Sequence, residues 1–282
     1  MQKKFTTTLA GRELTLETGE LAGLANGSVL VRYGDTVVLV NATASSKPRE
    51  GIDFFPLSVD YEEKLYAVGK IPGGFIRREG KPSEKAILTS RVIDRPIRPL
   101  FPKDLRNDVS IVATVMSVEI DNSPEIAAMI GTGAALAISD IPFNGPVAGV
   151  FVGLVDGEIV INPTLAQREK SDLELTVAAT REKVVMIEAG AKEVPEDVML
   201  KAIKTAHEEI KKLCDFIDNM AEEVGKPKFS YPSVEVDHDL YEKIKAFAYE
   251  KVEKALDTPD KHTRDVQVNK VGDEINEHFA EE

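Results

Sequence analysis

The sequence predicts an α+β fold, with mixed strands and helices followed by an all-helical segment. Runs rich in β-branched residues, separated by glycine-containing turns, alternate with stretches of helical spacing. Residues 195–224 carry apolar side chains three or four positions apart, which is typical of a long helix with one buried face. After about residue 228 the chain becomes polar, rich in both charges and poor in large apolar residues, which indicates a second, helical unit.

The early part of the chain is predicted to form strands. Residues 29–33 and 36–43 are rich in β-branched side chains, and the intervening Gly34-Asp35 predicts a hairpin because glycine opens a tight turn. Residues 109–118 form another β-rich run.

A loop rich in glycine and proline, residues 71–82, precedes a predicted helix. Ser83 offers an N-cap and Glu84 an acidic group in the first turn, so we expect a helix from about residue 83 to residue 95. Pro96 is expected to stop or kink this helix, because proline has no amide hydrogen.

The rest of the predicted fold alternates helices with strand pairs. Pro124 suits the first turn of a helix over residues 123–139, and Asp156-Gly157 predicts a second hairpin. The other predicted elements are strands over residues 147–154, 158–161, 173–179 and 183–189, the helix over 195–224, and helices within 237–282.

Basic residues are concentrated in one part of an acidic protein. The chain of 282 residues has a net charge of −13, whereas residues 64–106 hold eleven Lys or Arg and four Asp or Glu, a net charge of +7. Such a patch attracts a polyanion, and six of the eleven are arginine, whose planar fork suits phosphate. The alternative is that these charges form solvated faces or pair with acids between subunits.

Arg77 and Arg78 lie between glycines and close to Phe75, at the expected tip of the loop. There the guanidinium groups can reach a ligand, and the aromatic ring can stack on a base. The sequence therefore indicates a localised phosphate or nucleic-acid site.

Several classes of protein and site are excluded by composition. No apolar run reaches 18 residues, and the N-terminus lacks the apolar core of a signal peptide, so we expect no membrane span and no secretion. Cys214 is the single cysteine, so no internal disulfide can form, and we expect it to be buried or half-buried in a helix. The four histidines are scattered, which argues against zinc. A reducing cytoplasm fits these features.

Two small-ligand sites are disfavoured. Gly131-Thr132-Gly133 lies inside an apolar helical run rather than between a strand and a helix start, so close helix packing explains it better than nucleotide binding. No Walker-type loop occurs, and a nucleotide-binding regulatory domain would be supported only if nucleotides stabilised the chain. The candidate Mg²⁺ ligands Asp53, Asp60, Glu62 and Glu63 would alternate between strand faces, so surface or turn roles are preferred.

The basic segment also resembles a known family. Residues 73–84 read GGFIRREGKPSE and residues 91–102 read RVIDRPIRPLFP, and both are similar to the N-terminal half of bacterial polynucleotide phosphorylase. Further short segments that match the family, in the same order along the chain, lie at residues 16–19, 33–36, 53–57, 141–146 and 161–164.

The resemblance implies an RNase PH-like fold, similar to the second domain of ribosomal protein S5. Residues 1–228 would be the first RNase PH-like domain, with a core over 13–145 and a C-terminal subdomain over 146–228. Residues 229–282 would be the start of the family's all-α domain, truncated here. The family repeats the fold after the helical unit and ends in two small RNA-binding modules.

The resemblance also implies a function. Members degrade single-stranded RNA from the 3′ end with inorganic phosphate, release nucleoside diphosphates in a reversible reaction and require Mg²⁺. They form homotrimeric rings in the cytoplasm and take part in mRNA decay. They can work with a helicase or an endonuclease. We therefore expect RNA as the partner, and neither DNA nor a membrane.

The family's chemistry lies in its second repeat, which supplies a serine pair for phosphate and an Asp…Asp-x-Lys group for the metal and the transition state. Ser45-Ser46 is a serine pair, but it has no matching acid–lysine group. The resemblance therefore implies no catalytic residue and no metal ligand in this chain, with the Mg²⁺ site outside it. The 282 residues by themselves are expected to be inactive, and the alternative is a purely non-catalytic RNA-binding, ring-forming module.

The family's double-arginine loop grips the RNA backbone at the entrance of the ring, which implies RNA binding by Phe75, Arg77 and Arg78. For Phe75, stacking on a base and buttressing the loop remain alternatives. Ile76 stands where many members have a second phenylalanine. The family's basic helix matches Arg91, Arg95 and Arg98, for which RNA or phosphate contact and a structural role remain alternatives.

Overall fold

The computed structural model describes residues 2–49, 51–233 and 237–280 and confirms the α+β class. The chain divides into two compact units, Met1–Pro232 and Ser233–Glu282, whereas we expected a boundary after residue 228. Residues 234–236 and 281–282 of the expected all-α segment, 229–282, lie outside the described residues.

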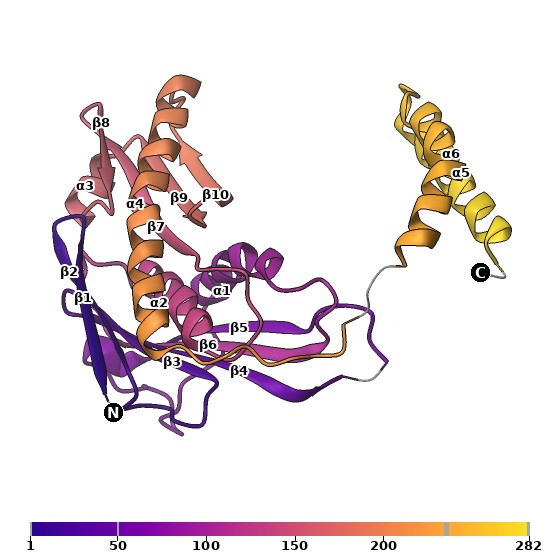
Figure 1. The fold of residues 1–282 in the computed structure, drawn as a ribbon. Coiled ribbons are helices and arrows are strands. Elements are labelled where there is room, and N and C mark those ends of the chain that lie inside the picture. The colour runs from indigo at the N-terminus through magenta and orange to yellow at the C-terminus, as the bar shows by residue number, and fades with distance from the viewer. Residues whose placement is uncertain (1, 50, 234–236, 281–282) are drawn as a thin grey trace. The chain divides into compact units, whose positions relative to one another are not determined.

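Six strands of the first unit form one mixed sheet in the order β1-β2-β3-β4-β6-β5 (Figure 1). The β5–β6 pair is parallel and the other neighbouring pairs are antiparallel. The predicted hairpin is confirmed, because Tyr33 pairs with Thr36 across the Gly34-Asp35 turn. The strands are β1 (Lys3–Leu9), β2 (Arg12–Thr18), β3 (Gly27–Tyr33), β4 (Thr36–Pro48), β5 (Leu57–Glu63) and β6 (Asn107–Ser117).

The basic segment forms the crossover between the two parallel strands. Parallel neighbours cannot be joined by a tight turn, and here a short 3₁₀ helix η1 (Leu65–Val68), a loop and helix α1 (Glu84–Ile97) connect β5 to β6. Ser83 caps α1 as predicted, accepting a hydrogen bond from the Ala86 amide at 3.0 Å.

The predicted end of α1 was wrong by two residues. Pro96 lies inside the helix, which runs to Ile97, and the Arg98 amide still donates to the Asp94 carbonyl. The missing amide of Pro96 removes one hydrogen bond of the ladder, and the buried Ile93 and Ile97 keep the turn packed on the core. A 3₁₀ turn, η2 (Arg98–Leu100), follows directly.

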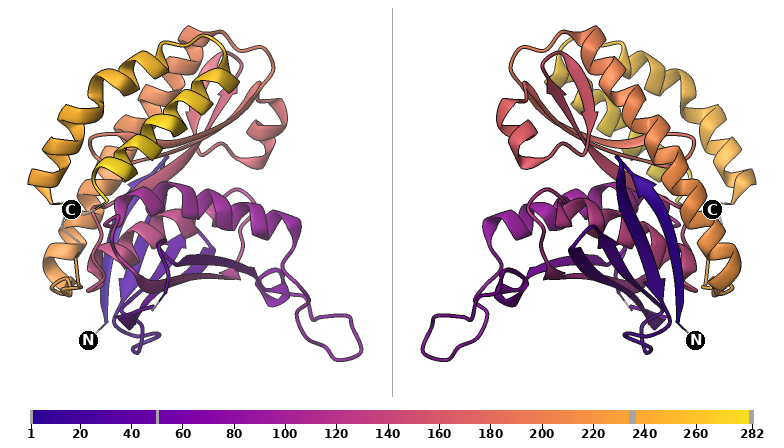
Figure 2. Two further views of the ribbon diagram at one scale, coloured as in Figure 1. Left: turned by 90° about the vertical axis from the view of Figure 1, so that its right-hand side faces the viewer. Right: turned by 90° about the vertical axis from the view of Figure 1, so that its left-hand side faces the viewer.

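Helix α2 (Pro124–Ile138) begins with Pro124 as predicted and lies with α1 between the two sheets (Figure 2). A Cβ atom on Gly131 would lie 2.6 Å from Val31 Cγ2, and one on Gly133 would overlap the Val147 carbonyl oxygen. The two glycines therefore let α2 approach its neighbours closely, as the sequence indicated.

A second, antiparallel sheet of four strands has the order β10-β9-β7-β8. Both predicted strand pairs are confirmed, with Asp156 and Gly157 at positive φ in the β7–β8 turn. The elements are β7 (Ala148–Val155), β8 (Glu158–Ile161), α3 (Leu165–Lys170), β9 (Leu173–Ala179), β10 (Val184–Ala191) and the long helix α4 (Glu196–Val224).

Arg12 connects the two sheets of the first unit. Its guanidinium donates to the carbonyl oxygens of Asp121, at 2.7 Å, and Asn162 and lies 5.2 Å from the centre of the Tyr33 ring. Asn162 follows β8 and in turn donates to the Tyr33 hydroxyl at 3.3 Å. This polar network ties the β1–β2 hairpin to the second sheet.

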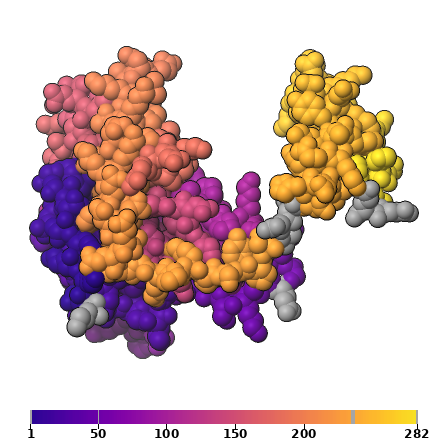
Figure 3. All heavy atoms as spheres, in the orientation of Figure 1, coloured from indigo at the N-terminus to yellow at the C-terminus, as the bar shows by residue number. Residues whose placement is uncertain are grey.

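Helix α4 covers the second sheet and extends beside the β1–β2 hairpin, where Lys3 Nζ lies 2.6 Å from Glu223 Oε1 (Figure 3). Cys214 on α4 is buried and free as predicted, and burial raises the pKa of its thiol to about 12. After α4, the amides of Lys226 and Phe229 donate to the carbonyls of Ile138 and Asp140 and hold the chain against the end of α2.

The second unit is a pair of helices, α5 (His238–Leu256) and α6 (Lys261–His278), as expected for this segment. Asp237 caps α5 by accepting hydrogen bonds from two amides of its first turn. The Phe247 and His278 rings stack with their centres 4.3 Å apart, and Lys251 Nζ lies 2.8 Å from Glu274 Oε2. The helices bury three side chains of this unit, those of Ala248, Ala255 and Val271, so its described core is small.

Candidate nucleic-acid interface

The loop between η1 and α1 is anchored at its base. The Glu79 carboxylate accepts a hydrogen bond from the Leu65 amide at 3.0 Å, and Ser83 Oγ donates to Glu63 at 2.8 Å. Lys64 Nζ lies 2.8 Å from Glu62, and this hydrogen bond raises the pKa of Lys64. Both limbs of the loop are therefore fixed to the end of β5.

The tip of the loop, by contrast, projects away from the first unit (Figure 2). Its internal contact is one turn, in which the Arg77 amide donates to the Gly74 carbonyl at 2.9 Å. Phe75 is fully exposed and Ile76 is 73% exposed. Such exposure of apolar side chains on a projecting loop indicates a contact surface.

Arg77 and Arg78 are exposed, and among the described residues their guanidinium groups have no hydrogen-bonding or ion-pair partner. Arg77 has a φ of 49°, in the left-handed region that residues other than glycine rarely adopt. Two arginines without a partner and an aromatic ring thus lie within residues 75–78. All the N–H donors of the two guanidinium groups are available to an anionic strand.

Arg98 is held differently, although it belongs to the same basic segment. Its guanidinium is bidentate to Asp94, at 2.7 and 2.5 Å, and reaches the Leu57 carbonyl at 3.2 Å. These contacts fasten the end of α1 to the start of β5, and they occupy most of the donors that an RNA phosphate would need.

Arg91 and Arg95 lie one turn apart on α1 and are both exposed. Arg95 lies 3.4 Å from Glu188 on β10, whereas Arg91 has no partner among the residues that the structure describes. The structure thus places Phe75, Arg77 and Arg78 together, and Arg91, Arg95 and Arg98 in three different environments on and after α1.

The carboxylates near the loop do not gather into a metal site. Glu62 faces Lys64 and Glu63 accepts from Ser83, so each already has a partner. Within residues 2–49, 51–233 and 237–280, no group of three or more histidine, cysteine or acidic side chains is arranged to hold a metal ion. The same part of the chain contains no helix that is both long and apolar enough to cross a bilayer.

Comparison with known families gives two matches. Residues 10–142 match the 3′ exoribonuclease family, domain 1, and residues 145–209 match the 3′ exoribonuclease family, domain 2. The fold is similar to the crystal structure of rice (Oryza sativa) Rrp46, with a TM-score of 0.59 at 16% identity, over 78% of this chain and 94% of that one.

Curated relatives are much more similar in sequence. The chain is 66% identical over 282 residues to a polyribonucleotide nucleotidyltransferase of Ruminiclostridium cellulolyticum, covering 100% of this chain and 40% of the relative. It is 59% identical to that of Caldicellulosiruptor saccharolyticus over 99% of this chain and 40% of the relative. It is 57% identical to that of Clostridioides difficile over 98% of this chain and 39% of the relative. The chain thus spans about 40% of the length of these relatives.

Proposed function

The chain belongs to the 3′ exoribonuclease family, and on this basis we propose that it is the RNA-guiding repeat of a polyribonucleotide nucleotidyltransferase. The whole enzyme would degrade single-stranded RNA from the 3′ end with inorganic phosphate, releasing nucleoside diphosphates reversibly and using Mg²⁺. It would act as a homotrimeric ring in cytoplasmic mRNA decay, with a helicase or an endonuclease as further partners.

The projecting loop carries this proposal. Guanidinium groups that no other residue neutralises bind phosphate oxygens through paired N–H donors, and Arg77 and Arg78 are such groups. Phe75 adds a ring on which a base can stack, whatever its identity. Together these residues hold the RNA strand by its backbone and guide it without selecting a sequence.

We place the chemical step outside this chain. The Ser45 hydroxyl of the one early serine pair donates to the Lys47 carbonyl at 2.7 Å and accepts from the Asp108 amide at 3.0 Å. It therefore has no proton left to donate to inorganic phosphate. The nearby carboxylates Glu62 and Glu63 also have partners, and the described residues contain no group of three or more acidic, histidine or cysteine side chains that could hold Mg²⁺.

RNA binding can be tested through its dependence on salt. Fluorescence anisotropy of a labelled oligo(A) at several salt concentrations should show that Arg77→Ala/Arg78→Ala flattens the plot of log affinity against log salt by about 0.7 for each lost phosphate contact. A matched control is Arg32→Ala/Arg49→Ala, because it removes the same charge from two arginines paired with Glu17 and Asp108. Equal slopes for the two double variants would contradict the role of the loop.

The location of catalysis has a separate test. We expect no phosphate-dependent release of ADP from poly(A) by the 282-residue chain in the presence of Mg²⁺. Release that survives removal of contaminating host enzyme would place a working site within this chain. The non-catalytic RNA-binding, ring-forming module is the alternative function, and the free arginines of the loop support it for this chain taken alone.

A further inference from the structure

The negatively charged Glu79 follows Arg77 and Arg78 directly in the sequence, yet it pairs with neither of them. Its carboxylate accepts a hydrogen bond from the Leu65 amide at 3.0 Å, across 14 positions of the chain. Within the described structure, no ion pair or hydrogen bond joins it to either arginine. Because an acid this close weakens the attraction of arginines for a polyanion, the place where Glu79 is held bears on RNA binding.

The Leu65 amide lies at the start of η1, where the local sequence supplies no cap. The first amides of a helix have no acceptor within it. Lys64 occupies the N-cap position but makes no side-chain capping hydrogen bond, and its ammonium lies 2.8 Å from Glu62. Glu79 therefore provides the missing acceptor from the far limb of the loop, and this contact closes the loop.

A second contact fastens the loop at a point further from the arginines. Ser83 Oγ donates to Glu63 Oε2 at 2.8 Å, which ties the start of α1 to the last residue of β5. Ser83 is five residues from Arg78, whereas the Cα atoms of the neighbours Arg78 and Glu79 are only about 3.8 Å apart. Glu79 is thus the anchor that restricts the backbone of Arg78.

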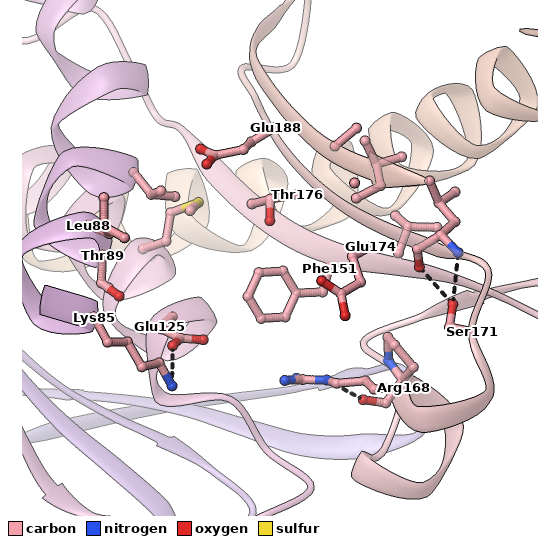
Figure 4. A pocket seen from close by; sticks show the side chains of 18 of the residues that line it. Lys85, Leu88, Thr89, Glu125, Phe151, Arg168, Ser171, Glu174, Thr176 and Glu188 are labelled. Atoms are coloured by element: carbon pink, nitrogen blue, oxygen red, sulfur yellow. Dashed lines mark hydrogen bonds and ion pairs between the residues drawn. The ribbon is translucent and has the colours of Figure 1, made fainter. Parts of the chain in front are cut away.

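The cleft of about 490 Å³ between α1 and the four-stranded sheet does not favour an RNA strand (Figure 4). Its two cations, Lys85 and Arg168, are outnumbered by three carboxylates, those of Glu125, Glu174 and Glu188. Lys85 Nζ lies 2.7 Å from Glu125, and the tip of the loop does not contribute to the lining. The position of the loop arginines therefore depends on the anchors of the loop.

We propose that Glu79 is a positioning residue for the RNA-guiding arginines, an inference that rests on the proposed function of the loop. Its hydrogen bond to Leu65 holds the Arg78 backbone before RNA arrives, so less conformational entropy is lost when the guanidinium groups bind phosphates. The same bond occupies the Glu79 carboxylate, which keeps it from pairing with either arginine. Glu79 itself would not contact RNA, because a carboxylate and a phosphate repel each other.

The test compares two variants that remove the same negative charge but differ in the hydrogen bond. Glu79→Gln keeps a side-chain oxygen that can accept from the Leu65 amide, whereas Glu79→Ala does not. Charge alone would make both variants bind oligo(A) more tightly. We instead expect Glu79→Ala to raise the Kd of the 282-residue chain by roughly threefold to tenfold. Glu79→Gln should bind as tightly as the wild type or more tightly.

Three further measurements separate positioning from RNA contact and from folding. The salt slope of Glu79→Ala should equal that of the wild type, since both arginines are present. The Leu65 amide should exchange with solvent several-fold faster in Glu79→Ala and at the wild-type rate in Glu79→Gln. In the Arg77→Ala/Arg78→Ala background, Glu79→Ala should weaken binding less than in the wild type, because a positioning residue acts through the residues that it positions.

Glu84→Ala is the matched control. Glu84 is exposed in the first turn of α1, next to Ser83, and its carboxylate has no partner among the residues that the structure describes. The substitution removes the same charge close to the loop but leaves both anchoring contacts in place. Oligo(A) should therefore bind this variant at least as tightly as it binds the wild type.

Three outcomes would overturn the proposal. They are unchanged or tighter RNA binding by Glu79→Ala, an equal loss of affinity in Glu79→Gln, and an equal loss in the Glu84→Ala control. If Arg77→Ala/Arg78→Ala flattens the salt slope while Glu79→Ala binds normally, the positioning role fails and the proposed function stands. If the arginine variant keeps the wild-type slope, the proposed function fails, and this inference fails with it.

Discussion

The loop tip and the end of α1 hold arginines from one basic segment in opposite ways. Arg77 and Arg78 are exposed and have no partner in the described structure, whereas Arg98 makes two hydrogen bonds to Asp94 and others to backbone carbonyls. Their sequence neighbourhoods are similarly basic, and only the contacts separate them. Local charge therefore does not reveal which arginines can bind a ligand.

The largest expected effect belongs to the loop. Arg77→Ala/Arg78→Ala should weaken oligo(A) binding by about 30-fold at low salt, because two charged contacts are lost at roughly 1 kcal/mol or more each. Its free energy of unfolding should stay within about 0.5 kcal/mol of the wild type, since these guanidinium groups make no hydrogen bond or ion pair with a described residue. Anisotropy and urea denaturation measure the two quantities. A destabilised variant would show that the loop arginines serve the fold.

Phe75→Ala should have the next largest effect on binding. Stacking on a base contributes about 1–3 kcal/mol, so the Kd for oligo(A) should rise at least fivefold while the salt slope stays the same. The matched control is Ile76→Ala, which shortens the adjacent exposed side chain but removes no ring. If both variants lost affinity equally, apolar contact rather than stacking would explain the role of the tip.

Arg98→Ala should have the opposite effect to the loop variants, lowering stability while leaving RNA binding almost unchanged. Loss of its bonds to Asp94 and the Leu57 carbonyl should lower the free energy of unfolding by about 1–2 kcal/mol, with partial exposure limiting the effect. RNA affinity should change less than twofold. Arg91→Ala removes an unpaired arginine from the same helix and should leave stability within about 0.5 kcal/mol. A large loss of RNA affinity in Arg98→Ala, with stability intact, would move Arg98 to the binding surface.

The smallest effect concerns Arg95, whose pair with Glu188 is long and half-exposed. Glu188→Gln should lower the free energy of unfolding by about 0.2–1 kcal/mol at low salt. The difference should vanish at 1 M salt, where the screening length is about 3 Å. Urea denaturation at both salt concentrations checks this, and a difference that persists at 1 M would mean that the pair is less solvated than its exposure indicates.

Much of the fold could be predicted where local chemistry is decisive. The Gly34-Asp35 turn, the Ser83 cap and Pro124 at a first helical turn each act within a few residues. The β1–β2 hairpin was not assigned, although Ala10-Gly11 between two alternating strands was a usable signal, with both residues at positive φ. The parallel pairing of β5 with β6 had no local signal, because a crossover joins strands that are far apart in the sequence.

The candidate site shows the same division. Exposure of Phe75, Arg77 and Arg78 followed from their position in a glycine-rich loop. The environment of Arg98 did not follow, because continuation of the helix through Pro96 and the approach of Leu57 decide it. The Arg12 network and the cleft beside Arg168 were also missed, since their members come from distant segments.

The sequence by itself determined the α+β class, the family resemblance and the concentration of positive charge in residues 64–106, because these depend on composition and on short sequence motifs. Only the tertiary structure decided which cations are already paired and which side chains line one cleft. The physical reason is that hydrogen bonds and ion pairs act over a few ångströms, and Leu57 and Glu188 come within reach of Arg98 and Arg95 only after the chain has folded.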